Sequence, residues 1–339
     1  MNIWIKGAVT MIAALTLAAS SQAAEWNFYG SARVKTFYET VDNTKGTDAT
    51  NLDMGLQGNA RIGAKVKVTD ELKGLFEYGA KDGTANIRQL YGEWNFGAGS
   101  LLVGQTYTPI YTVYSNSVYS EDGALEKFGA TSASRLSMLC LTFGGFQIAA
   151  IEPGKKALGG GTMEVKIPKL EASYTANFDA ASVKAVVGYN TYDVDSIDVN
   201  SYVAGLGAKM TFGPAYLAGS FFFGRNLGTY GFKIVTDADP KISGTSMVDN
   251  DSFGCTVVAG YKLNDMLSFE AGYGYTESEL DQSAFSKDDA SQYYLQAKIT
   301  LAPGVFVYPE IGKQDQGKDK TGAEQGDTTY AGVKWQINF

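Results

Sequence analysis

The sequence predicts an all-β fold, a 16-stranded antiparallel transmembrane β-barrel. Three observations predict it: an export signal at the N-terminus, long segments in which apolar and polar side chains alternate, and a regular succession of short turns and longer polar connections. The composition agrees, because aromatic residues, which favour strands, reach 13% of the chain.

The composition also excludes several classes of protein. Hydrophobic residues make up 45% of the chain and charged residues 19%, which is typical of neither a disordered chain nor a helical membrane protein. The 339 residues include no His, so serine triads, papain-type dyads and zinc sites with His ligands are excluded. A net charge of −8 argues against binding to nucleic acid.

The first 23 residues have the pattern of a signal peptide, which makes residues 24–339 the mature protein. Lys6 supplies a positive charge, an apolar run extends from Gly7 to Ala19, and Ser21-Gln22-Ala23 is a small-x-small cleavage site. Because the run is shorter than the about 20 residues of a membrane helix, we expect cleavage after Ala23 rather than an anchor. The exported chain has only 2 Cys, so one disulfide is possible but not implied.

Alternation is clearest at two places. In residues 329–339 the odd positions are mostly apolar, ending with Trp335, Ile337 and Phe339, and the even positions are mostly polar. Residues 56–68 alternate throughout, which is longer than the about 5–6 residues usual for soluble strands. Strands that cross a bilayer need about 9–11 residues, so this length favours a barrel over a soluble secreted sandwich.

The connections set the number of strands. Seven short turns alternate with eight mostly longer segments, and this requires sixteen strands, an even number as in bacterial barrels. The expected strands are 25–39, 55–68, 74–80, 85–96, 100–107, 135–143, 146–152, 167–178, 181–193, 199–212, 215–226, 251–263, 266–278, 290–301, 305–315 and 327–339.

A sheet inside a bilayer must close, because lipid offers no partner for backbone N–H and C=O groups at an edge. Sixteen strands leave a lumen too wide for side chains to fill, so we expect it to hold water. The polar face then points inward, and the apolar face points to lipid or to a neighbouring subunit. Residues two positions apart in a strand share a face, which places Cys140 with Met138 and Cys255 with Phe253. We therefore expect both thiols to face outward.

Four short segments resemble those of general bacterial trimeric porins. They are Trp26-Asn27-Phe28-Tyr29-Gly30-Ser31-Ala32-Arg33-Val34, Leu102-Val103-Gly104-Gln105-Thr106-Tyr107-Thr108-Pro109, Phe143-Gly144-Gly145-Phe146 and the terminal Phe339. Details resemble porins of sulfate-reducing bacteria more than those of enteric bacteria. The resemblance implies a non-enzymatic channel in the outer membrane of a Gram-negative bacterium, through which ions and small hydrophilic solutes diffuse passively.

The resemblance also implies partners and a site. The partners are two further copies in a homotrimer, membrane lipid with lipopolysaccharide, and the barrel-insertion machinery, which would read Phe339. In such porins the third loop folds into the lumen and faces an arginine ladder. Here the loop is about Thr108–Ser134. The residues that the resemblance assigns are Glu121, Asp122 and Glu126 on the loop, and Arg33, Arg61, Arg88 and Arg135, with Lys35 and Lys65, on the wall.

Two features depart from this pattern. Glu126-Lys127-Phe128-Gly129 differs from the Pro-Glu-Phe-Gly-Gly sequence common in the family. Arg33 and Arg61 are opposite in parity to their apolar neighbours, but Arg88 shares its parity with Leu90 and Trp94. An inward Arg88 therefore requires a β-bulge or a strand end above the membrane.

Several alternatives stay open. The arginines could be ordinary lumen residues in channel water, and 108–134 or 227–250 could form a binding site in a substrate-selective channel. A barrel enzyme lacks its commonest base without His, and a secreted adhesin would be soluble without detergent. Acidic loops could hold divalent cations, but none has the spacing of a calcium loop, and we expect no cofactor or metal.

Overall fold

The computed structural model describes residues 24–339 except 43, 45–47 and 283. The expected signal peptide, residues 1–23, lies outside the described residues, so cleavage after Ala23 stays a prediction. Among the residues that are described, no helix is long and apolar enough to cross a membrane.

The described chain consists of strands joined by turns, loops and a few single helical turns. The helical turns are η1 (Lys81–Gly83), α2 (Tyr119–Asp122), η2 (Leu158–Gly160) and α3 (Leu227–Tyr230). The strands are β1 (Glu25–Asp42), β2 (Ala49–Leu56), β3 (Arg61–Lys67), β4 (Leu72–Gly79), β5 (Asn86–Asn95), β6 (Ser100–Tyr107), β7 (Arg135–Phe143), β8 (Phe146–Ile151), β9 (Met163–Glu164), β10 (Lys169–Asn177), β11 (Ala181–Val194), β12 (Ile197–Phe212), β13 (Ala215–Arg225), β14 (Lys241–Ser243), β15 (Ser246–Val248), β16 (Asn250–Lys262), β17 (Leu267–Leu280), β18 (Asp288–Ala302), β19 (Val305–Asp315) and β20 (Asp327–Asn338).

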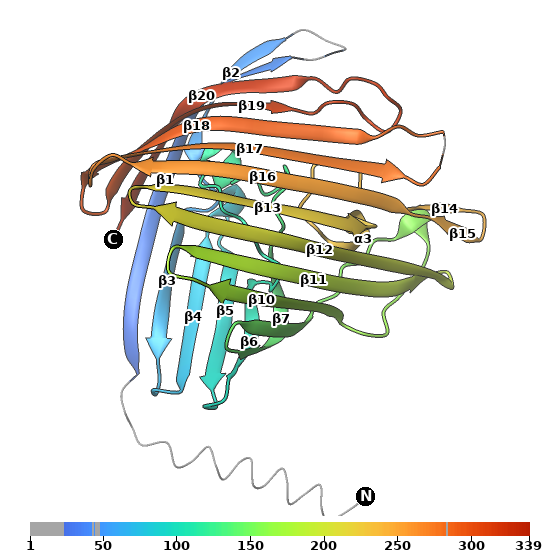
Figure 1. Ribbon diagram of the computed structural model, residues 1–339, viewed down its shortest axis with the longest axis horizontal. Helices are drawn as coiled ribbons and strands as arrows, with labels where there is room; N and C mark the ends of the chain where they lie inside the picture. The colour runs from blue at the N-terminus through green and yellow to red at the C-terminus, as the bar shows by residue number, and fades with distance from the viewer. Residues whose placement is uncertain (1–23, 43, 45–47, 283) are drawn as a thin grey trace, which may run out of the picture.

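These strands close into one antiparallel barrel. β1 pairs with β20 from Ser31–Asn338 to Asp42–Asp327, which joins the first strand to the last. β2 and β3 lie end to end along β1 and act as one interrupted strand, as β9 and β10 do along β11. With β14 and β15 paired in a separate hairpin, the described barrel has sixteen strands, which confirms the predicted fold class (Figure 1).

The two surfaces of the barrel differ as the alternation predicts. Trp26 and Phe28 on β1 are 52% and 69% exposed, and Ile337 on β20 is 53% exposed. Polar side chains of the opposite parity, such as Gln292 and Gln296 on β18, are buried inside. A continuous band of exposed apolar side chains fits contact with lipid rather than with water.

Two expected connections are shorter in the structure. The connection expected between the strands 25–39 and 55–68 is wrong at both ends, because β1 continues to Asp42 and residues 49–56 form β2 against it. The expected connection 194–198 is only a turn, in which Asp195 and Ser196 have φ of 50° and 68°. Two successive left-handed residues are the signature of a type I′ hairpin, whose twist matches that of the strands.

Cys140 faces inward, contrary to the expectation. It is 4% exposed and packs with Met138 and Ile151, whereas Leu139 on the same strand is 55% exposed. Since β7 is apolar on both faces, alternation alone does not determine its parity. Cys255 has the outward parity that was expected, and both thiols are free.

Candidate functional site

The connection between β6 and β7, residues 108–134, contacts strands on opposite sides of the barrel. Carboxylates of three strands accept hydrogen bonds from its backbone N–H groups. The pairs are Ile110 to Glu171 on β10 at 3.2 Å, Asn116 to Glu270 on β17 at 2.7 Å, and Val118 to Glu310 on β19 at 2.7 Å. Charge-assisted bonds of this kind are stronger than neutral ones, so they fix the path of the segment.

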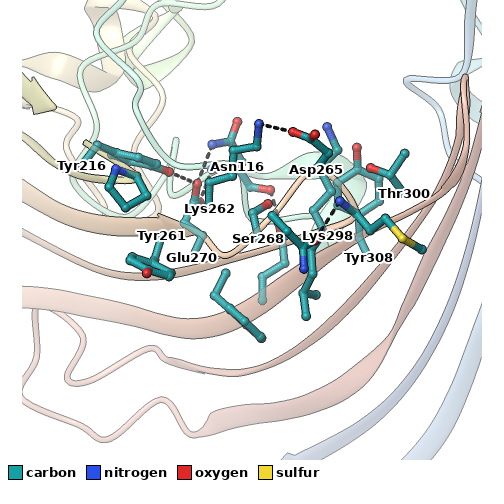
Figure 2. Close-up of a pocket in the computed structure, with 16 residues that line it drawn as sticks. Asn116, Tyr216, Tyr261, Lys262, Asp265, Ser268, Glu270, Lys298, Thr300 and Tyr308 are labelled. Carbon is teal, nitrogen blue, oxygen red and sulfur yellow. Dashed lines mark hydrogen bonds and ion pairs between the residues drawn. The ribbon is translucent and has the colours of Figure 1, made fainter. Parts of the chain in front are cut away.

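Glu270 is the middle of these three anchors. Figure 2 shows Tyr216 and Asn116 converging on its carboxylate, and Tyr294 also donates its hydroxyl there. The side chain borders a cavity of about 500 Å³ that reaches the short turns at Pro214 and residues 264–266. The segment therefore has open space on its short-turn side.

The tip of the segment is a left-handed turn. Five residues have φ between 52° and 64°: Ser120, Glu121, Asp122, Ala124 and Leu125. The left-handed conformation costs about 1–2 kcal/mol per residue and needs strong contacts to persist. Leu125 is completely buried, and the ring of Tyr119 stacks on Tyr330 with centroids 3.6 Å apart. These contacts hold the carboxylates of Glu121 and Asp122 in place.

Both carboxylates pair with cations of the wall. Asp122 lies 2.6 Å from Arg33 Nη1 on β1 and 3.1 Å from Lys334 Nζ on β20. Glu121 lies 2.8 Å from Lys35 Nζ and also accepts the backbone N–H of Gly58, in the break between β2 and β3. The break thus brings the wall and the tip of the segment into direct contact.

Glu77 on β4 organises the next part of the wall. Its Oε1 accepts from Arg88 Nε at 2.8 Å and lies 3.4 Å from Arg61 Nη1, while Tyr29 donates its hydroxyl to Oε2 at 3.0 Å. Glu77 is 3% exposed. One buried carboxylate therefore orients two guanidinium groups.

A bulge explains the inward position of Arg88. The register between β4 and β5 shifts after Glu77, so that Tyr78 pairs with Ile87 and Arg88 is passed over. Ile87 and Leu90 both stay exposed, whereas Arg88 is 7% exposed. The extra residue reverses the parity of the strand locally, as β-bulges do.

Arg135 reaches the same space from the first position of β7. It shares its parity with the outward Leu139, so alternation does not account for its placement. The preceding Ser134 is left-handed, with φ of 66°. The Arg135 guanidinium lies 5.1 Å from the ring centroid of Tyr107 and donates to the Tyr107 hydroxyl at 3.2 Å.

The groups gather around one cavity of about 370 Å³. Its charged lining residues are Arg33, Arg61, Arg88, Arg135, Lys334, Glu121, Asp122 and Glu126. Glu126 accepts a hydrogen bond from Ser132 Oγ at 2.6 Å within the segment. Lys35 contacts the cluster through Glu121, but Lys65 lines a different cavity near the turn at Asp70 and is not part of it.

Neutral groups of the segment complete the lining. Tyr111 borders the same cavity, and burial raises the pKa of its phenol, so it stays neutral and can donate a hydrogen bond. In the described part of the chain no three His, Cys, Asp or Glu side chains lie together so that they could hold a metal ion. The arrangement therefore offers opposed fixed charges around a polar gap.

Glu77, Lys334 and Tyr107 were not predicted as site residues. Lys334 lies on the polar face of the last strand, which alternation does show. A carboxylate such as Glu77 has no sequence signal, because its partners come from β1, β3 and β5 and become neighbours only in the closed barrel.

A closed barrel with an apolar exterior and a charged interior defines an outer-membrane channel protein. Residues 8–319 match the family model described as Gram-negative porin, so the chain belongs to this family. The branch found in sulfate-reducing bacteria stays a prediction. No curated protein sequence matches the chain.

Solved structures of similar fold are outer-membrane channels and porins. The outer membrane channel DcaP of Acinetobacter baumannii has a TM-score of 0.78 at 19% identity, covering 94% of this chain and 99% of that one. OmpF of Salmonella typhi, in complex with daunomycin, has a TM-score of 0.66 at 17% identity, covering 92% and 97%. The anion-selective porin of Comamonas acidovorans has a TM-score of 0.64 at 13% identity, covering 93% and 100%. At these identities the likeness establishes the fold alone.

Proposed function

We propose that the charged cavity is the constriction of a non-enzymatic channel through which ions and small hydrophilic solutes diffuse passively. The family establishes an outer-membrane channel. The observation that supports a charged constriction is the pairing of Asp122 with Arg33 and Lys334. This pairing fixes the tip of the 108–134 segment against the wall, so that the acidic side chains of the segment and Arg61, Arg88 and Arg135 border one cavity. Opposed charges across a water-filled gap orient dipolar solutes, disfavour apolar ones and bias the choice of ion.

Current through a planar bilayer tests this proposal. The reversal potential across a salt gradient reports ion preference, and Glu121→Gln, Asp122→Asn and Glu126→Gln together remove three negative charges from the cavity. We expect the reversal potential to move toward anions. The matched control neutralises Glu279, Asp281 and Glu324 near the loop end of the barrel. An equal change in both triple variants would show that the segment does not form the constriction.

The alternative is a substrate-selective channel with a solute-binding site in the lumen. The adjacent rings of Tyr107 and Tyr111, tilted by 42° with centroids 4.2 Å apart beside Arg135, favour it. Conductance that saturates with one class of solute would support this function, whereas conductance proportional to concentration supports passive diffusion.

We propose a homotrimer in the membrane. On the outer surface, a depression of about 340 Å³ lies between β1, β3 and β4 and is lined by Ala32, Ala60 and Ile62. Small and apolar side chains suit contact with a neighbouring subunit better than contact with lipid headgroups. The mass of the detergent-solubilised complex, measured by light scattering, tests the stoichiometry. Gly58, in the break between β2 and β3, donates its backbone N–H to Glu121 on the inner side of the wall.

Phe339 is proposed as the signal for barrel insertion. Its backbone bonds reciprocally with Gly30, at 2.6 and 3.1 Å, and its ring is 74% exposed. The ring is thus presented on the outside at the seam between β1 and β20. Phe339→Ala should slow assembly in cells more than spontaneous folding in detergent. Equal slowing of both would assign Phe339 to packing alone.

A further inference from the structure

The inner wall formed by β11, β12 and β13 carries a patch of apolar side chains where a water-filled lumen would require polar ones. Val186, Val203 and Phe222 have the inward parity, and they are 3%, 2% and 0% exposed. Apolar side chains facing a channel would stay in contact with water, which costs about 25 cal/mol for each Å². Something inside the barrel therefore covers this wall.

Two segments form the cover: the loop between β13 and β16, and the two ends of the 108–134 segment, whose Ile110 and Ala133 lie in the same apolar cluster. Leu227, Tyr230 and Phe232 are buried against this wall in one apolar cluster, and the Phe232 ring lies 4.6 Å from that of Phe222. Tyr230 donates its hydroxyl to Glu171 on β10 at 2.8 Å. The same carboxylate accepts from Ile110, so it joins this loop to the start of the 108–134 segment.

The loop also holds the far part of the 108–134 segment. Lys233 N donates to the Ser132 carbonyl at 2.8 Å, and Val235 N donates to the Lys127 carbonyl at 3.1 Å. Beyond these bonds the loop reaches the next strands of the wall. Thr236 shares a hydrogen bond with Ser278 on β17, and Asp237 N donates to Asp288 on β18 at 2.8 Å.

We infer that residues 227–239 form a second constriction segment, which closes the lumen along β10–β18 and confines permeation to the side of the barrel that carries the arginines. The segment acts as a determinant of size and charge selectivity without touching the charged cavity. It does so by excluding water from the apolar wall and by fixing the back of the 108–134 segment.

Accessibility of an introduced thiol tests the cover without measuring conduction. In a Cys140→Ser, Cys255→Ser background, Val203→Cys places a thiol under the cover, and Lys65→Cys places one in exposed lumen. A charged, water-soluble thiol reagent should modify Lys65→Cys and leave Val203→Cys unmodified. Replacing 227–239 by a short Gly-rich turn should make Val203→Cys react as fast as Lys65→Cys. Reaction of Val203→Cys in the full-length chain would overturn the inference, and so would protection that persists after the replacement.

A second experiment measures single-channel conductance, and it rests on the proposed channel function. The shortened variant should conduct more current per channel, with a reversal potential closer to zero, because ions gain a path that bypasses the charged cavity. The matched control removes 242–247, most of the β14–β15 hairpin, and leaves 227–239 intact. A shortened variant with unchanged conductance would overturn the inference. A wild-type protein that conducts no current would instead overturn the proposed function, and the thiol result would still stand.

Discussion

Glu77 accepts the Nε–H of Arg88 at 2.8 Å across a register shift between β4 and β5, inside a wall that otherwise carries positive charge. The bulge turns Arg88 inward, and the carboxylate then holds it beside Arg61. Two guanidinium groups thus share one counter-charge. The wall keeps a net positive charge with side chains in fixed orientations, which is what a channel needs to act on a passing ion through a steady field.

Glu77→Gln tests the effect of this carboxylate on selectivity. The substitution removes one negative charge at nearly constant volume, so the reversal potential should move toward anions. Loss of charge-assisted bonds to buried groups should also lower stability, by about 1–3 kcal/mol. The urea midpoint of the purified barrel measures the second effect. Glu93→Gln is the control, because Glu93 pairs with Lys73 nearer the short turns. A larger change in reversal potential for Glu93→Gln than for Glu77→Gln would contradict the prediction.

A double-mutant cycle separates pairing from burial. Arg88→Met alone leaves Glu77 buried with fewer donors, and Glu77→Gln alone leaves Arg88 without its carboxylate. The double variant removes both charges, so its loss of stability should be smaller than the sum of the single losses, with a coupling of about 0.5–3 kcal/mol. Additive losses would mean that the 2.8 Å contact contributes little.

The pairing of Asp122 with two cations predicts a change in channel noise. Asp122→Asn weakens the contacts to Arg33 and Lys334, which fix the left-handed turn against the wall. The turn should then move, and open-channel current should fluctuate more than in the wild type. Glu126→Gln is the control, because Glu126 lines the same cavity and accepts a hydrogen bond from the hydroxyl of Ser132 within the segment itself. Equal fluctuations in both variants would show that Asp122 contributes charge and not position.

Strand alternation alone predicts the barrel and the inward positions of Arg33 and Arg61, because the two-residue period is a local property of the chain. Arg88 and Arg135 follow a different rule. The first depends on a bulge, and the second on a left-handed Ser134 just before the strand. The two-residue period does not determine the side of Cys140, since apolar residues occupy both faces of β7 and the inward ones pack against Ala149 and Ile151 of β8.

The sequence of β13 indicates an apolar patch on the inner face of the barrel. Phe222 lies between Phe221 and Phe223, and one of the two faces of β13 must therefore carry an aromatic side chain against the lumen. A polar lumen excludes that arrangement unless a loop fills the space. The sequence does not indicate which loop fills this space, because Tyr230 and Glu171 become neighbours only in the closed barrel.

Glu310 is the anchor that stability should depend on most. It accepts from Val118 N and Ser117 Oγ at 2.7 Å, and from Tyr330 Oη at 3.0 Å, while it is 4% exposed. Glu310→Gln replaces one accepting oxygen by an NH₂ group, which faces donors that can no longer bond to it. Leaving such buried donors unsatisfied costs about 1–3 kcal/mol for each.

The thermal midpoint of the Glu310→Gln barrel in detergent should therefore fall, and the 108–134 segment should become accessible to proteases that spare the wild type. Glu279→Gln, an exposed carboxylate on β17, should change neither property. If Glu310→Gln keeps both the wild-type midpoint and the protease resistance, the path of the segment is set by Glu171 and Glu270 and by apolar packing around Leu125, and not by the carboxylate on β19.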